Sequence, residues 1–403
     1  MLELQQTLDV EPIVDRARSL WRAARDRAST ARIELFVKAA MRSRVSRDLD
    51  GKSARSDRVR ESGLALRAFL VGQDRAGFAA SSGHSEDVVR WAVDTACTFR
   101  AQASASAPSA SDSVAAERWD LEAAASLPTE DALTTALGAR PHLEWIEAGT
   151  TVEVLIGAEG WLAVRRRHRL WARCGGPGAR LVAQRGIAGW ERLVDDSIDD
   201  SLECGAVSGD WEGLVLAPAA AAPLVSALVD AFHGSGPARA VNVGKGWHVV
   251  DEPVRSDGLA GGSFDDAGFP AASRILATDG VWVGMLKGPG SFWRVSFREP
   301  PRESATNLLI PSGEKASIPN RAAFAGRCRV LRPSAELWVL ELDLVDPGNV
   351  VVLERRWVRV EPQALLASCA ARLGRSRVTP TGPIVPTLMF EGSALSLTGR
   401  SSD

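Results

Sequence analysis

The stretch from 257 to 286 constrains the fold more than any other, because it encodes a tight β-hairpin. Asp279 and Gly280 separate two short apolar runs, 275–277 and 281–283. An Asp-Gly pair between such runs favours a two-residue hairpin turn, since both central residues of that turn need positive φ. The stretch therefore predicts a loop, a strand, a turn and a second strand, and hence antiparallel pairing in this part of the chain.

Helical and alternating patterns in the first hundred residues predict an α+β unit. The spacing of apolar residues places an amphipathic helix at 9–30, strands at 32–39, 64–70 and 76–80, and a second helix with Ser85 as its N-cap. The strand patterns alternate between apolar and polar residues, as half-buried strands do. We therefore expect an antiparallel sheet with helices packed against it.

Composition and pattern divide the chain into four parts. Residues 1–100 form the predicted N-terminal α+β domain with its antiparallel sheet, and 101–118 form an Ala/Ser-rich linker. A middle segment follows at 119–210. The rest, 211–403, is strand-rich and predicts a C-terminal domain built on a curled or barrel-like antiparallel sheet. The predicted fold class is α+β.

The charge balance argues against several classes of partner. The chain has 48 basic and 50 acidic residues and a net charge of −2, which offers no electrostatic footprint for nucleic acid or a membrane surface. No apolar run is long enough to span a bilayer, and no basic start followed by an apolar run indicates a signal peptide. The five scattered cysteines fit reduced thiols. We expect a cytoplasmic protein.

A basic run, Arg-Arg-Arg-His-Arg at 165–169, lies in a predicted strand at 161–174. Charged side chains on an edge strand discourage pairing with other sheets, so we interpret the run as a solvated edge strand. A docking site for acidic peptides is the alternative. The acids of a predicted helix at 189–204 fall at helical spacing, which spreads them over a solvated face and argues against a metal cluster.

Catalytic motifs are missing: the chain has no nucleophile elbow, no Walker loop and no Rossmann fingerprint. A zinc-peptidase helix needs two histidines on one face and a glutamate base. The helix that ends at His233 and starts at or near Pro223 has Leu228 and Val229 where the other histidine and the glutamate are needed. This helix therefore offers at most one metal ligand and no general base.

Four segments carry a resemblance to a known family: GLALRAFLVGQDRAGFAASSG at 63–83, LVLAPAAAAPLVSALVDAFHGSG at 214–236, the glycine-rich and hairpin stretch at 258–286, and ATNLLIPSGE at 305–314. In these segments the sequence resembles the TldD/PmbA (TldE) family, and they match in the family's order and cover most of residues 30–100 and 210–315. The last third matches only loosely, and the glycine-rich motifs usual near the family's C-terminus are not apparent after Glu314.

The resemblance implies a division of labour between two subunits. In that family the TldD-type subunit carries an HExxxH helix that binds zinc together with a distant cysteine, and the TldE-type subunit lacks it. The two form a heterodimer that encloses the active site. Because Leu228 and Val229 stand at the motif positions, this chain resembles the TldE type. The expectation is no metal and no cofactor here, zinc in a TldD-like partner, and extended or unfolded peptides as substrate.

Four residues are candidates for lining the shared cavity or contacting the partner: His233, Asp265, Asp266 and Asn307. For the two aspartates an alternative stays open, since Asp side chains also cap the backbone of their own loop. A lone histidine at a helix C-terminus is also commonly a cap or a surface residue.

Three functions remain to be distinguished. The first is a non-catalytic TldE-like subunit of a zinc peptidase that degrades peptides or removes leader segments during natural-product maturation. The second is a self-sufficient enzyme with a relocated site, using His233 with Cys328 or Cys369. The third is a peptide-binding module without hydrolysis, which could add a peptide strand to a sheet edge.

Overall fold

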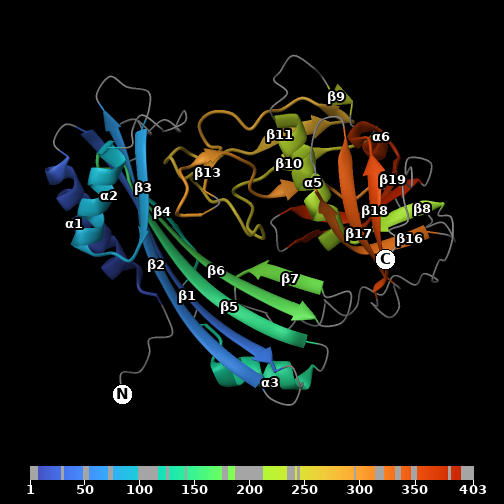
Figure 1. The fold of residues 1–403 in the computed structure, drawn as a ribbon, viewed down its shortest axis with the longest axis horizontal. Helices are drawn as coiled ribbons and strands as arrows, with labels where there is room; N and C mark the ends of the chain where they lie inside the picture. Colours follow the sequence, from blue (N-terminus) through green and yellow to red (C-terminus); the bar gives the residue numbers. More distant parts are fainter. Residues whose placement is uncertain are drawn as a thin grey trace.

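The computed structural model shows two large β-sheets, each with helices on one face, and a long loop region between them (Figure 1). We call them sheet A, which is built from the first half of the chain, and sheet B, which is built from the second half. None of the described helices has the length and apolarity to cross a membrane. The structure describes residues 8–28, 31–48, 54–70, 76–98, 117–123, 127–140, 143–174, 180–186, 212–233, 241–242, 246–294, 296–313, 322–331, 337–345, 352–379 and 383–391.

Sheet A has seven described strands in the order β3-β2-β1-β5-β6-β4, with β7 also paired to β6. Its neighbours pair antiparallel except for β4, which runs parallel to β6. The long strands β1 and β2 pair without a register shift, so their alternating apolar residues all reach one face. The strands are β1 (Ala31–Arg47), β2 (Ala54–Leu70), β3 (Ala76–Ser82), β4 (Glu117–Leu121), β5 (Leu143–Ile156), β6 (Leu162–Cys174) and β7 (Arg180–Arg185).

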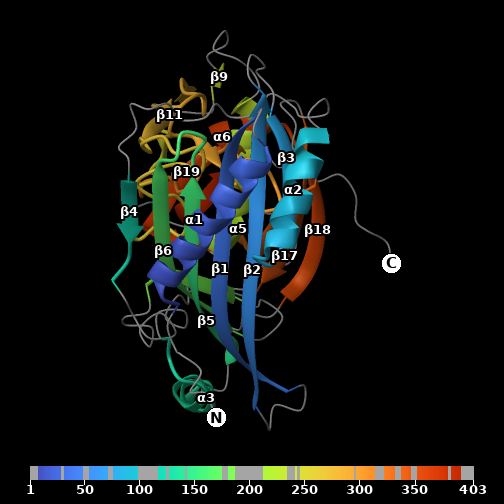
Figure 2. The ribbon, with the colours of Figure 1, turned by 90° about the vertical axis from the view of Figure 1, so that its left-hand side faces the viewer.

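Helices cover one face of sheet A, which we call its outer face. Figure 2 shows α1 (Val10–Arg27) and α2 (Glu86–Thr98) lying on this face. Their apolar stripes pack against Ile33, Leu35 and Val37 of β1. Helix α3 (Glu130–Ala139) covers the same face further along the strands, where Met41 and Val45 of β1 point. The opposite, inner face is therefore free to receive the loops of the second half.

Sheet B has eleven described strands in the order β18-β17-β16-β8-β20-β15-β10-β11-β12-β9, with β19 paired to β20. Helices α5 (Pro218–His233) and α6 (Pro362–Ala367) contribute to its core. The strands are β8 (Gly213–Leu216), β9 (Val241–Asn242), β10 (Val249–Asp251), β11 (Arg274–Thr278), β12 (Val281–Trp282), β15 (Leu308–Leu309), β16 (Ala322–Val330), β17 (Trp338–Val345), β18 (Val352–Val360), β19 (Cys369–Val378) and β20 (Ile384–Glu391).

The predicted α+β class and the strand-rich second half are confirmed, with two refinements to sheet B. The sheet is mixed, because β8 runs parallel to β16 and β15 runs parallel to β20. Its described strands form an open order from β18 to β9, so they do not close into a barrel. A separate two-stranded ribbon, β13 (Phe292–Trp293) with β14 (Arg302–Glu303), belongs to the loop region between the sheets.

Two local turn signals work as predicted. Strands β11 and β12 form the expected hairpin, and Asp279 and Gly280 have φ values of 47° and 80°. Both values are positive, as the predicted turn requires. The hydroxyl of Ser85 accepts a hydrogen bond from the backbone N–H of Val88 at 3.2 Å, so Ser85 is the N-cap of α2.

The predicted start of α5 is wrong. The helix begins at Pro218, and Pro223 lies inside it. Proline is tolerated in a first turn because its missing N–H has no intrahelical partner there, and Pro218 fills that role. The alanines 219–222 then propagate the helix strongly enough to accept an interior proline with one hydrogen bond fewer. Of the predicted linker, Glu117 and Arg118 belong to β4, while 101–116 and the predicted helix at 189–204 lie outside the described residues.

Candidate functional site

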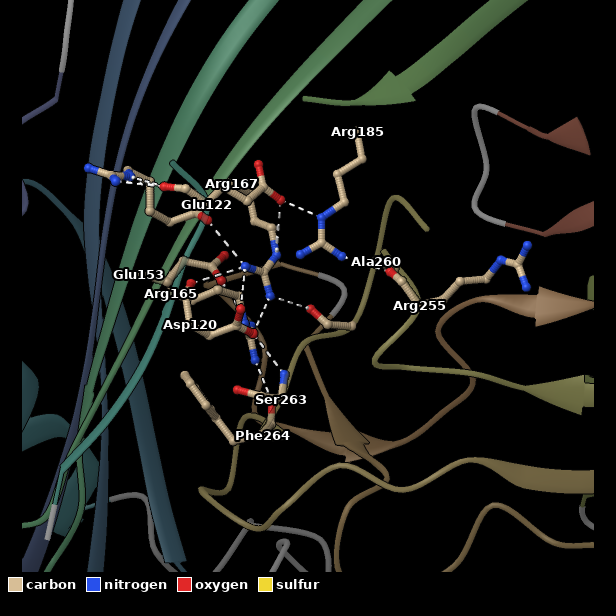
Figure 3. A network of polar contacts seen from close by, with 12 residues as sticks. Asp120, Glu122, Glu153, Arg165, Arg167, Arg185, Arg255, Ala260, Ser263 and Phe264 are labelled. Atoms are coloured by element: carbon tan, nitrogen blue, oxygen red, sulfur yellow. Dashed lines mark hydrogen bonds and ion pairs between the residues drawn. The ribbon is translucent and has the colours of Figure 1, made fainter. Parts of the chain in front are cut away.

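Loops of the second half meet the inner face of sheet A through a network of buried arginines and carboxylates (Figure 3). The arginines come from strands β6 and β7, and the carboxylates come from both halves of the chain. This contact joins segments about a hundred residues apart in sequence, for example Arg165 and Asp266. Because it brings several buried arginines and carboxylates together from distant segments, this network is the candidate site.

Arg165 of β6 is the centre of the network. One of its nitrogens, Nη1, donates to Glu153 of β5 and to Asp266 of the loop, both at 3.0 Å. Its other terminal nitrogen donates to the carbonyl oxygen of Phe264 at 2.6 Å, and the guanidinium lies 4.7 Å from the centre of the Phe264 ring. A second ring, Trp293, lies 5.3 Å away. Arg165 thus ties two carboxylates and two aromatic rings together.

Arg167 makes a second tie through Asp120 of β4. Its guanidinium donates to both carboxylate oxygens of Asp120, at 3.1 and 2.6 Å, and to the carbonyl oxygen of Gly261 at 3.2 Å. Asp120 also accepts from the backbone N–H of Ser263 at 2.7 Å. Burial acts to raise the pKa of Asp120, but the hydrogen bond and charge of Arg167 outweigh it and lower the pKa to about 2.

Arg185 of β7 makes the third tie. It donates to the carboxylate of Glu122 and, at 2.8 Å, to the carbonyl oxygen of Arg255. The other carboxylate oxygen of Glu122 accepts from the backbone N–H of His168 at 2.6 Å. Each of these three arginines therefore spans from sheet A to the loop at 255–266. Moving the loop would break the buried ion pair between Arg165 and Asp266, and the hydrogen bonds that Arg167 and Arg185 donate to its carbonyl oxygens.

The interpretation of the basic run as a solvated edge strand is wrong. Strand β6 pairs with β5 on one side and with β4 and β7 on the other. Arg165, Arg167 and His168 are only 6%, 3% and 3% exposed. Their charges are tolerated inside because carboxylates from distant segments meet the two arginines, while Thr150 pairs with His168 at 2.8 Å and burial lowers the pKa of that histidine.

The two candidate aspartates hold the loop together. The carboxylate of Asp265 accepts four backbone N–H bonds, at 2.8 to 3.1 Å, from Ala267, Phe269, Gly290 and Phe292. Burial raises the pKa of Asp265 to about 6, against the opposing effect of these bonds. Ala267 and Phe269 are local donors, as the alternative of backbone capping anticipated, whereas Gly290 and Phe292 come from the segment beyond the β11–β12 hairpin.

Asp266 has a different task, since it links this loop to sheet A. One of its oxygens accepts from Arg165, and the other accepts from the backbone N–H of Arg294 at 2.7 Å. Its side chain is buried. The adjacent aspartates therefore divide their work, with Asp265 shaping the loop and Asp266 attaching it.

Asn307 is fully buried and braces the other end of the loop. Its amide oxygen accepts from the N–H of Ala260 at 3.0 Å, and its amide nitrogen donates to the carbonyl oxygens of Glu252 and Ala260 at 3.1 and 2.8 Å. His233 is the last residue of α5, and its side chain lies outside the described structure. Asp265, Asp266 and Asn307 thus all hold the loop region, whereas His233 belongs to helix α5.

Helix α5 is a core helix at the positions where a zinc motif is expected. Leu228 and Val229 are 0% and 4% exposed and belong to the core of sheet B. Their side chains cannot ligate a metal or take a proton. In the described part of the chain, no group of three His, Cys, Asp or Glu residues could hold a metal ion. The described residues of this chain therefore do not fit the zinc site that the resemblance assigns to the other subunit type.

Neither cysteine of the relocated-site hypothesis is placed as a reactive thiolate. Burial raises the pKa of Cys328 to about 12, and burial also raises the pKa of Cys369 to about 12. A nucleophilic cysteine needs the opposite shift, because the thiolate is the reactive form.

Asp120 makes acid stability testable. Its pKa of about 2 lies below the ordinary value of 3.8, so its contribution to stability is complete above pH 4 and is lost as the pH falls from 4 to 2. We expect Asp120→Asn to remove about 2 kcal/mol of this pH dependence. Urea unfolding at a series of pH values measures it, and an unchanged slope between pH 4 and 2 would contradict the assigned ion pair.

Comparison with known proteins supports the architecture. No protein-family model matches the sequence, and no curated protein matches it. TldE from Thermococcus kodakarensis superposes with a TM-score of 0.65 at 14% identity, covering 93% of this chain and 98% of that one. A putative modulator of DNA gyrase from Bacteroides thetaiotaomicron gives 0.62 at 14% identity over 94% and 98% of the two chains. A corresponding protein from Thermotoga maritima gives 0.60 at 11% identity over 93% and 98%. The chain therefore has, over nearly its whole length, the fold of TldE and of the putative DNA gyrase modulators.

Proposed function

We propose that this chain is a TldE-like, non-catalytic subunit of a heterodimeric zinc peptidase, whose zinc and general base are supplied by a TldD-like partner. The observation that carries the proposal is the combination of a TldE fold over 93% of the chain with apolar, buried residues at the motif positions of α5. Leu228 and Val229 pack into the hydrophobic core, so these two positions of the helix stabilise the fold and offer no reactive group. The chemistry must then come from a second polypeptide.

In this proposal the chain forms part of the surface that encloses the peptide, and it supplies no reactive group. The inner face of sheet A and the loop at 255–266 are locked together by three buried arginine ties, which makes a rigid surface. A rigid wall is useful to a peptidase that encloses its substrate, because ordering the substrate then costs no ordering of the protein. Extended peptides are the substrate class, either in degradation or in removal of leader segments, and the site of action is the cytoplasm.

The test is reconstitution from purified subunits. The chain alone should not cleave an unstructured peptide such as denatured casein, and it should retain no stoichiometric zinc after dialysis. Adding a homologue with an HExxxH helix should yield a complex by size-exclusion chromatography, together with cleavage that a chelator stops. The matched control is the same partner with its motif glutamate changed to glutamine, which should still assemble but not cleave. Cleavage by the chain alone would overturn the proposal.

Binding of peptide without cleavage, in the presence of a partner that does carry zinc, would instead identify a peptide-binding module. The same reconstitution separates the two outcomes, because complex formation and cleavage are read independently.

A further inference from the structure

Lys38, Arg294 and Arg298 are among the described basic side chains near the inner face of sheet A that form no ion pair with a carboxylate. They differ from the arginines of the buried network, each of which meets at least one acid. Their contacts are to aromatic rings and to backbone or hydroxyl oxygens. Because uncompensated positive charge next to apolar surface costs free energy, this arrangement needs an explanation.

The guanidinium of Arg294 packs against two phenylalanine rings. Its guanidinium carbon is 4.9 Å from the centre of the Phe36 ring and 5.8 Å from that of Phe78. One terminal nitrogen donates to the carbonyl oxygen of Glu299 at 2.6 Å, and the buried Nε has no hydrogen-bond partner. Burial, and then the nearby charge of Arg67, lower the pKa of Arg294 to about 10. Within the described structure the side chain forms no ion pair, and the carboxylates of Asp266, Glu34 and Glu153 act on it only through their charge.

The other two cations, Lys38 and Arg298, both lie near the ring of Phe297. This ring lies directly over Gly63, where a side chain would overlap it. Gly63 pairs with Lys38 on one neighbouring strand and with Ser82 on the other. The ammonium of Lys38 lies 6.0 Å from the centre of the Phe297 ring, and the guanidinium of Arg298 lies 5.4 Å from it. Arg298 also donates to the hydroxyl of Ser82 at 3.2 Å.

The nearby acids are already engaged. Glu34 pairs with Arg67, with the Nε of Arg67 at 2.7 Å from its carboxylate. Glu153 and Asp266 both accept from Arg165. Lys38 acts on Glu153 only through its charge, which helps to lower the pKa of that carboxyl. The cluster therefore keeps a surplus of positive charge where β3, the edge strand of sheet A, meets Arg294 and the turn at 296–299.

We propose that Lys38, Arg294 and Arg298 form a subsite for a carboxylate of an extended peptide. Guanidinium groups bind carboxylates with short, charge-assisted hydrogen bonds, and flanking rings strengthen such bonds by excluding water. This inference rests on the proposed function, because it names the substrate class of that surface: peptides with acidic residues or with a free C-terminus. Both sources present the same group, and they are separated by experiment.

The experiment measures binding of fluorescent, unstructured peptides to the full chain by anisotropy. Three matched peptides are needed: one with two glutamates and a free C-terminus, one with glutamines in place of the glutamates, and one with the glutamates and an amidated C-terminus. We expect the first to bind about tenfold more tightly than at least one of the others, and the difference to shrink with added salt. A loss on changing glutamate identifies the side chain as the source, and a loss on amidation identifies the terminus.

Variants assign the effect to the cluster. The double variant Lys38→Gln with Arg298→Gln should abolish the preference, and neither side chain donates a hydrogen bond to the buried network. Arg22→Gln is the matched control, because Arg22 is an exposed arginine of α1 on the outer face of the same sheet. Equal affinity for all three peptides would overturn the inference, and so would an equal loss in the control. Partner-dependent cleavage that ignores peptide charge would overturn the subsite and leave the proposed function standing. Selective binding without partner-dependent cleavage would support the subsite and overturn the proposed function.

Discussion

Arg165→Met should lower the free energy of unfolding by about 3 to 5 kcal/mol, the largest effect expected of any substitution in the network. Methionine keeps much of the volume but leaves Glu153 and Asp266 in a buried site without their shared cation. Two like charges then face each other in a medium of low dielectric. The loop at 255–266 also loses one of its three ties, so limited proteolysis should cut there first. Urea denaturation followed by tryptophan fluorescence measures the change.

The matched control for this variant is Arg90→Gln on α2. Arg90 pairs with Asp87 on the helix surface, where the two side chains are 59% and 85% exposed. Water solvates both groups once the pair is broken, so the expected change is under about 1 kcal/mol. A similar stability of Arg165→Met and the wild-type chain would show that the loop does not depend on the buried pairs, and it would remove the rigid wall from the proposed function.

Gly77→Ala should destabilise the first half of the chain by about 3 kcal/mol or more, an overpacking effect at the upper end of the usual range. Gly77 lies in β3 where α2 crosses it, and an added methyl group would overlap the backbone carbonyl of Ala96. Backbone cannot rotate away as a flexible side chain can, so α2 must move off the sheet. Thermal unfolding and hydrogen exchange of the α2 amides report the shift.

Gly138→Ala provides the opposite expectation from the same substitution. Gly138 lies in α3, and a methyl group there meets nothing within 4 Å. Alanine favours helix over glycine, so this variant should be more stable by about 0.5 to 1 kcal/mol. A neutral Gly77→Ala variant would contradict the close contact between Gly77 of β3 and the Ala96 carbonyl of α2.

The candidate site shows where reasoning from the sequence succeeds and stops. Arg165 and Arg167 are two residues apart, and a strand places such residues on one face, so the spacing was a usable signal of a shared environment. The residues that neutralise them are at 120, 153 and 266, and no local spacing connects these positions. A basic run whose acidic partners are distant in sequence has the same local pattern as a solvated strand, so the sequence favours the solvated interpretation. Asp265 and Asp266 are candidates from the sequence, but several of their backbone donors lie 25 or more residues away, where no local pattern names them.

By itself the sequence determined the α+β class, the Asp-Gly hairpin, the N-cap of α2 and the apolar residues at the motif positions of α5, because each depends on side chains within a few residues of one another. The tertiary structure alone decided that β6 is an interior strand and that sheet B is mixed. It also decided that Lys38 and Arg298 lie against the Phe297 ring, and Arg294 against Phe36 and Phe78, without an ion pair to a described carboxylate. Those outcomes depend on which distant segments meet. A charge is buried or solvated according to its neighbours in space, and the order of residues along the chain does not name them.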